Sequence, residues 1–163
     1  MKRSITIRRL AAVSASIAAV AALGAGTASA NVSANAVTRT FSFIAKPNSK
    51  TTTLVNIDSL LVNARCDSTG KPLVFAFSSA SSADIFGRIF DGNGRVHILK
   101  NSTFTSQTKG IQLSPTSGDY DATGTFLFET STGKVVTVNL AFDNSTTLNK
   151  QNVCTVYGSM IAT

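Results

Sequence analysis

Apolar and polar residues alternate along much of the chain after residue 30, and this period of two constrains the fold more than any other feature. Successive side chains of a β-strand point to opposite faces, so such alternation predicts strands with one buried face. The apolar phase is clearest in five runs: Phe41/Phe43/Ala45, Leu60/Val62/Ala64/Cys66, Phe75/Phe77, Val136/Val138/Leu140/Phe142 and Cys154/Val156/Gly158/Met160. The best helix candidate, residues 80–85, is Ser-rich and too short to stand alone.

Turn-forming residues separate these runs. They occur in four groups: Lys46–Ser49, Ser68–Pro72, Asp91–Gly94 and Ser131–Lys134. The last two predict hairpins, because Gly and Asn tolerate the positive φ that hairpin turns require. Short strands interrupted this often are typical of two all-β architectures. We therefore expect a single antiparallel β-sandwich or closed barrel of about eight to ten strands.

The chain has two cysteines, Cys66 and Cys154, and both lie in the apolar phase of their expected strands. A metal-binding pair would need further Cys or His ligands at short spacings, and the chain has one His. We therefore predict a structural disulfide that joins an early strand to the last one.

Residues 1–30 show the three zones of a cleaved signal peptide. Four basic residues precede an uncharged, Ala-rich run over residues 10–26, and Ala28 and Ala30 then form a small-x-small cleavage pattern. Ser and Gly interrupt the apolar run, which would make a weak membrane span of about 17 residues. We expect a signal-peptide helix, cleavage after Ala30, and a secreted extracellular domain of residues 31–163 with no membrane anchor. An arginine pair also suits twin-arginine export, but the residues after it are weakly hydrophobic, so general secretion is favoured.

Removal of the signal peptide changes the charge balance. Four of the 15 basic residues and none of the 8 acidic ones lie in residues 1–30, so 11 basic and 8 acidic residues remain. The remaining cations are scattered and no stacking aromatics lie among them, so the sequence does not indicate a nucleic-acid partner.

His97 is the sole histidine, and no Gly-x-Ser-x-Gly motif accompanies it. We interpret it as an exposed strand histidine. The turn that begins at Asp91 could offer oxygen ligands to calcium, but it lacks the other acidic positions of a calcium loop and a plain hairpin explains it. The sequence therefore predicts no metal site and no cofactor.

Paired carboxylates are the residues from which a small hydrolase could be built, since a glycosidase needs two acids across a cleft. Two pairs are candidates: Asp119 with Asp121, and Asp84 with Asp91. Both pairs also suit ordinary turn chemistry, in which Asp side chains accept backbone hydrogen bonds. We assign no catalytic residue.

Phenylalanine is the dominant aromatic residue, with ten copies beside two Tyr and no Trp. Nearly all ten are expected to face the core. Phe86 and Phe90 flank Gly87–Ile89 and break the alternation there, so we expect one of them to be exposed. An exposed Phe on a secreted β-domain marks a candidate contact surface.

Several segments of the chain resemble small secreted proteins of unknown function from actinobacteria. The resemblance lies in residues 64–72, 124–126, 131–138 and 154–158, which read ARCDSTGKP, GTF, STGKVVTV and CTVYG. It implies a disulfide-bonded β-domain in a bacterial, exported setting, and it implies no catalytic residue.

The function that these observations favour is a non-enzymatic extracellular binding or structural module. Its partner would be cell-wall material, another protein or a small apolar ligand, and the last would require Phe-lined space inside the fold. The alternative is a small secreted hydrolase that uses paired carboxylates.

Overall fold

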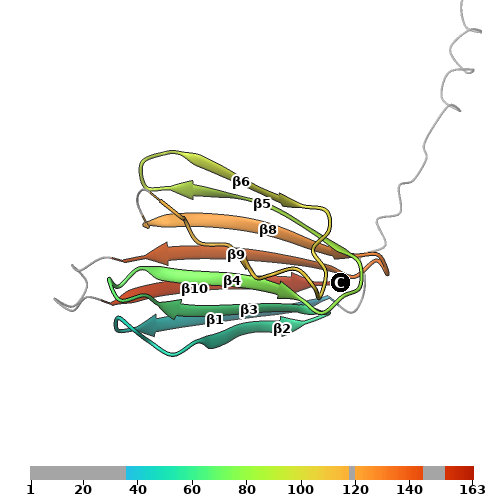
Figure 1. The fold of residues 1–163 in the computed structure, drawn as a ribbon, viewed down its shortest axis with the longest axis horizontal. Helices are drawn as coiled ribbons and strands as arrows, with labels where there is room; N and C mark the ends of the chain where they lie inside the picture. The colour runs from blue at the N-terminus through green and yellow to red at the C-terminus, as the bar shows by residue number, and fades with distance from the viewer. Residues whose placement is uncertain (1–35, 118–119, 145–152) are drawn as a thin grey trace, which may run out of the picture. The chain divides into compact units, whose positions relative to one another are not determined.

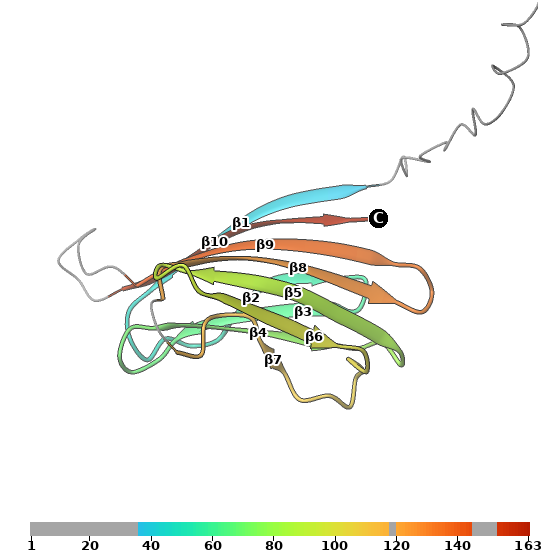
Figure 2. The ribbon, with the colours of Figure 1, turned by 90° about the horizontal axis from the view of Figure 1, so that it is seen from above.

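The computed structural model describes residues 36–117, 120–144 and 153–163. They form ten strands in two antiparallel sheets that pack face to face (Figures 1 and 2). The larger sheet has the order β1 (Val37–Ala45), β10 (Cys154–Ala162), β9 (Val135–Asp143), β8 (Ala122–Thr130), β5 (Ala83–Asp91), β6 (Val96–Asn101). The smaller sheet has the order β2 (Thr52–Ile57), β3 (Leu60–Cys66), β4 (Pro72–Ser78), β7 (Ile111–Gln112). The all-β prediction is confirmed, and the fold is the β-sandwich rather than the closed barrel.

The core lies between the two sheets and follows the predicted alternation. Along β3 and β9 every second residue is buried, which gives the patterns expected for strands with one face toward a core. Fully buried side chains come from both sheets: Leu60, Val62 and Val74 from the smaller sheet, and Ile85, Phe126, Phe128, Val136, Val138, Val156 and Met160 from the larger one. The core is therefore filled by side chains, which argues against the barrel that would hold an apolar ligand.

Three hairpin turns use the same local geometry. Each ends in a Gly with φ between +75° and +85°, a conformation that L-residues rarely adopt: Gly70, Gly94 and Gly133. In each, the side chain of the residue that opens the turn accepts a hydrogen bond from the backbone N–H four positions later, at 2.8–3.1 Å: Asp67 from Lys71, Asp91 from Arg95, and Thr130 from Lys134. The β5–β6 and β8–β9 hairpins were predicted from these residues.

The two cysteines form the predicted disulfide, with 5.9 Å between their Cα atoms. Cys66 is the last residue of β3 and Cys154 the first of β10, so the bond joins the two sheets. Both residues are fully buried. The bond and the sandwich are compatible with an extracellular protein.

The expectation that nearly all phenylalanines face the core is wrong. Phe75 and Phe77 lie on the outward face of β4 and are half-buried, and Phe86 and Phe90 lie on the outward face of β5. Conversely, the most deeply buried phenylalanine, Phe104, is not on a strand at all. It lies in the irregular segment after β6, and its backbone N–H donates to the carbonyl oxygen of Ala83 at 2.9 Å.

Residues 1–30, with Ala28 and Ala30, lie outside the described part of the chain, so the signal peptide stays a prediction. No helix in the described ranges is long and apolar enough to cross a membrane.

Candidate functional site

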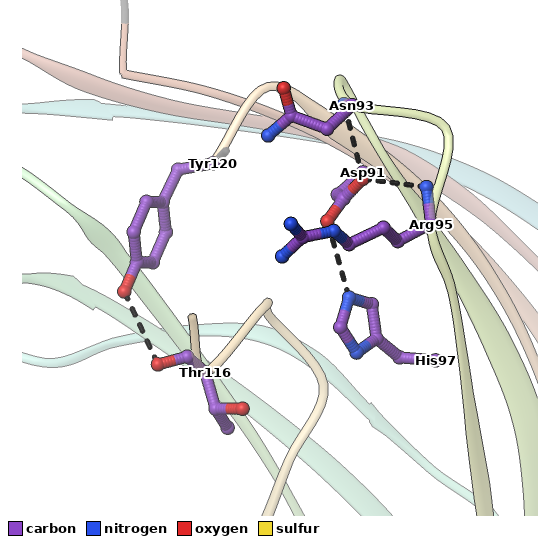
Figure 3. Close-up of polar contacts among 6 residues, drawn as sticks. All are labelled: Asp91, Asn93, Arg95, His97, Thr116 and Tyr120. Atoms are coloured by element: carbon purple, nitrogen blue, oxygen red, sulfur yellow. Dashed lines mark hydrogen bonds and ion pairs between the residues drawn. The ribbon is translucent and has the colours of Figure 1, made fainter. Parts of the chain in front are cut away.

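The β5–β6 hairpin gathers the polar residues that the sequence analysis singled out. Asp91 ends β5 with its side chain turned inward, and that side chain is fully buried. One carboxylate oxygen accepts the backbone N–H groups of Asn93 at 3.1 Å and Arg95 at 2.8 Å. The other lies 3.3 Å from Nε2 of His97 (Figure 3). The carboxylate is thus occupied on both oxygens by its own hairpin.

His97 differs from its expected setting. It belongs to the inward-facing side of β6, its side chain is 35% exposed, and it forms the ion pair with Asp91 when it is protonated. The predicted strand position is confirmed, but the side chain is half-buried and paired with Asp91 instead of fully exposed. The reason is that the Asp-x-x-Gly turn fixes the phase of the hairpin, and this phase brings both side chains inward.

The pKa of Asp91 is lowered below its ordinary value. The backbone N–H of Arg95 is the largest cause, and hydrogen bonds from His97 and Asn93 add to it, while burial opposes the shift. The pKa of Asp67 is also lowered: burial raises it, but the backbone N–H of Lys71 and the hydrogen bonds from Thr69 outweigh that effect.

These two carboxylates predict a loss of stability in acid. A carboxyl group whose pKa is lower in the folded than in the unfolded state stabilises the fold above its unfolded pKa, near 3.8. That contribution is lost as the pH falls through the folded pKa. We expect the urea midpoint of the wild type to fall steeply below about pH 4.

Asp91→Asn should be less stable than the wild type at pH 6 and should lose less stability on acidification. Asp84→Asn, on the outward face of the same strand, is the matched control and should keep the wild-type loss; equal pH curves for Asp91→Asn and the wild type would contradict the assignment.

The structure separates one candidate carboxylate pair. Asp84 and Asp91 lie at the two ends of β5 and on its opposite faces, seven residues or about 23 Å apart along the strand. They cannot act on one substrate bond. Asp119 of the other pair lies outside the described residues, so its pairing with Asp121 stays a prediction.

Asp91, Asp121 and Asp143 instead line one shallow depression of about 610 Å³ at the ends of β5, β8 and β9. Asp121 accepts the backbone N–H of Asn144 at 3.2 Å, and Asp91 is held by its turn as described. Among the described residues there is no group of three or more His, Cys, Asp or Glu side chains placed to hold a metal ion.

A second feature is the apolar outward face of the larger sheet. Phe86 is 53% exposed and Phe90 43% exposed, so both are exposed, not one as predicted. They do not break the alternation of β5, because the inward positions are Ala83, Ile85, Gly87, Ile89 and Asp91. Asp91 could have indicated the correct phase from the sequence. Because its turn places its side chain inward, every even-numbered residue of β5 must face outward.

Neighbouring strands extend this surface. Phe86 is in register with Leu127 of β8, and Phe90 is in register with Val96 of β6. Ile98, at 75%, is the most exposed large apolar residue in the described chain. We call the five residues together the β5–β6 patch: Phe86, Phe90, Val96, Ile98 and Leu127.

The patch has the size of a functional surface. Its exposed fractions correspond to roughly 400–500 Å², within the range of about 300–600 Å² for the largest apolar patch of an ordinary monomer, which is often functional. Arg88 lies between the two phenylalanines, and its guanidinium is 5.7 Å from the centre of the Phe90 ring. In the described part of the smaller sheet, by contrast, no large apolar side chain is exposed to this degree.

A cleft of about 390 Å³ runs along the outer edge of β6. Strand residues 97–100 form one wall, and the segment from Gln112 to Thr116 supplies the other. Ile89, Leu99 and Pro115 give it apolar surface. Beyond its rim, the Tyr120 hydroxyl reaches the carbonyl oxygen of Thr116 at 3.5 Å (Figure 3).

No protein-family model, curated protein or solved structure matches this chain. Evidence for a function therefore comes from the geometry of the described residues.

Proposed function

We propose that the protein is a secreted, non-enzymatic binding module whose contact surface is the β5–β6 patch. Five large apolar side chains on three adjacent strands of one sheet are the observation that carries this proposal. Apolar surface of this extent is unfavourable in water, and it is typical of sites that a partner covers. The inter-sheet disulfide supports the extracellular part, since such bonds persist in oxidising compartments. The setting we propose is bacterial, in keeping with the proteins that the sequence resembles.

The patch also has the composition of an interface centre. Interface cores are enriched in aromatic residues and Arg, and energetic hot spots concentrate in such side chains. Here two Phe rings flank Arg88, with aliphatic residues around them. Phe and Arg held on strands also present a surface that needs little rearrangement before binding.

The hydrolase is the second candidate, and one observation supports it. Asp121 and Asp143 line the same depression as Asp91. The carboxylate of Asp91 is engaged by two backbone N–H groups and His97, which leaves it poorly placed to act as a base or nucleophile. We rank this reading second.

Retention on surface material tests the contact surface. The purified protein, residues 31–163, is mixed with washed envelope material of the source organism and with its culture proteins, and the bound fraction is measured. Phe86→Ser with Phe90→Ser should weaken binding at least tenfold, because each buried Phe contributes about 1.5–3 kcal/mol and 1.4 kcal/mol is tenfold.

Ile44→Ser with Tyr157→Ser is the matched control. These two residues are exposed on the same face of the larger sheet, at its β1–β10 side. The control pair should leave binding within about threefold of the wild type. Equal losses for the two double variants, or no loss for either, would reject the β5–β6 patch as the contact surface.

A further inference from the structure

In the described part of the chain β6 is an edge strand of the larger sheet, and its pairing is regular along its whole length. Exposed edge strands are usually shielded by short length, bulges, inward charges or a Lys on the strand, because their unpaired N–H and C=O groups can pair with another chain. In the smaller sheet, β2 has a bulge between Thr53 and Val55, and β7 is two residues long. At the other margin of the larger sheet, β1 has Arg39 on its inward side, beside Val55 and Met160.

Of these devices β6 lacks the bulge and the very short length, but His97 points inward and Lys100 lies on the strand. Its six residues pair with β5 in continuous register from Asn101 to Val96, without a bulge. The sequence of the strand, Val-His-Ile-Leu-Lys-Asn, contains no Pro and one charged residue, Lys100. Figures 1 and 2 show β6 at the outer margin of the sheet, with β5 as its one strand neighbour.

The cleft beside β6 has room for a further extended segment. The 390 Å³ cleft is lined by Ile98 at the edge and by His97, Leu99 and Ile89, which point inward, so it lies beside β6 on the inward side of the sheet. Pro115 and Ser114 form part of the far wall, and both are buried. A strand added there would find apolar contacts on both of its faces.

We propose that β6 binds an extended segment of a partner protein by strand addition, and that this segment has alternating apolar residues flanked by acidic ones. This inference rests on the proposed function, since the added side chains on the outward face would join the β5–β6 patch. Those on the inward face would enter the cleft beside Leu99. Main-chain hydrogen bonds to β6 would provide affinity, and the alternating side chains would provide specificity.

Charge decides which occupant fits. Arg95 precedes β6, Lys100 lies on it, and Arg88 faces outward on β5 opposite Ile98; all three are exposed. Of the acids on β5, Asp91 is buried in its turn, and Asp84 is exposed on the outward face near the Lys100 end of the hairpin. Three exposed cations against one exposed acid leave the edge net cationic, most clearly at its Arg95 end, which favours acidic flanks on the added segment.

The same charges disfavour a second copy of this chain. An antiparallel β6–β6 pair would bring Arg95 of one copy to the level of Lys100 and Asn101 of the other, and the reverse at the other end. Like charges placed opposite each other across strands are destabilising.

The test uses a synthetic nonapeptide of five alternating valines and threonines with two glutamates at each end. Fluorescence anisotropy with the disulfide-bonded protein should show saturable binding of this acidic peptide. The same peptide with lysines in place of the glutamates should bind at least tenfold more weakly. Two further peptides carry N-methyl groups on alternate amides, one set in each phase. One phase should abolish binding and the other should keep it within about threefold, because only one edge of an added strand pairs with β6.

Amide hydrogen exchange shows where on the protein the peptide binds. The peptide should protect alternate amides of β6 and leave β1, the opposite edge of the same sheet, unchanged. Ile98→Asn should weaken binding at least tenfold, and Ile44→Asn on β1 should not.

Three results would overturn strand addition at β6: no binding of the acidic peptide, equal effects of the two N-methyl phases, or protection outside β6. A concentration-dependent dimer of the protein alone that protects β6 would assign the edge to a second copy instead. If the peptide fails while Phe86→Ser with Phe90→Ser still abolishes retention on envelope material, the strand-addition mode is wrong and the contact surface stands. If the peptide does not bind and the double Phe variant retains full binding to envelope material, both strand addition and the proposed function are wrong.

Discussion

Removal of the disulfide should lower the free energy of unfolding by about 4–5 kcal/mol, the chain-entropy estimate for closing a loop of this length. Cys66 and Cys154 are 88 residues apart in sequence, so the bond restricts a large part of the unfolded chain. For a domain whose whole stability is about 5–15 kcal/mol, this is about a quarter or more of the total. Cys66→Ala with Cys154→Ala should lower the thermal midpoint by on the order of 15 °C, measured by circular dichroism.

Reduced wild-type protein is the control for this experiment. It keeps the volume of both sulfur atoms and loses only the covalent bond, so its midpoint should fall nearly as far as that of the double variant. If reduction leaves the midpoint unchanged while the double variant is destabilised, the effect comes from lost packing and not from the cross-link.

Phe104→Ala should lower the free energy of unfolding by about 3–5 kcal/mol, as much as the truncation of a buried aromatic residue on a strand would lower it. The ring of Phe104 is fully buried and meets the ring of Phe128 edge to face, with 6.0 Å between the ring centres. It fills space under β5 and β8 from a segment that is not part of either sheet. Its loss would leave a cavity that the surrounding strands cannot close. Urea unfolding followed by intrinsic fluorescence of tyrosine measures the change.

Phe86→Ala provides the same chemical change at an exposed position. We expect it to alter the free energy of unfolding by less than about 1 kcal/mol, because an exposed side chain leaves no cavity. A similar cost for both variants would show that Phe104 does not support the core.

The fold class could be predicted from the sequence because the strands have one buried face. The run from Val136 to Phe142 has its apolar residues two apart, and each of them is buried in β9. The turns at Asp91 and Ser131 were recognisable because Gly94 and Gly133 occupy positions of positive φ. The disulfide followed from a count of cysteines and the expected compartment.

The pairing order of the strands could not be predicted, since alternation says which face is buried and not which strand is adjacent. A hairpin was also hidden at Asp58 and Ser59, which join β2 to β3 with φ values of 44° and 73°. Asp58 is a residue that tolerates such a conformation, but Ser59 is not the Gly that usually follows it in a hairpin turn. Here the pairing of Ile57 with Leu60 imposes the conformation.

The candidate site was predicted only in outline. Phe86 and Phe90 were singled out, but the patch around them depends on register. Leu127 of β8 becomes a neighbour of Phe86, and Val96 of β6 becomes a neighbour of Phe90. Phe104 fits the expectation that phenylalanines face the core, but it does so from outside the strands. Side-chain chemistry alone could not place it in an irregular segment.

The position of β1 has a consequence for the order of events during synthesis. β1 is made first among the strands, yet its one strand partner is β10, more than 100 residues later in the chain. The hairpins β2–β3, β3–β4, β5–β6 and β8–β9 join strands that are adjacent in sequence and can form as the chain emerges. β1 pairs later, because its partner lies far along the chain. Closing so long a loop costs conformational entropy before any contact between the two strands can offset that cost. Completion of the larger sheet, and with it the meeting of the two cysteines, is thus a late step that begins only when β10 has been made.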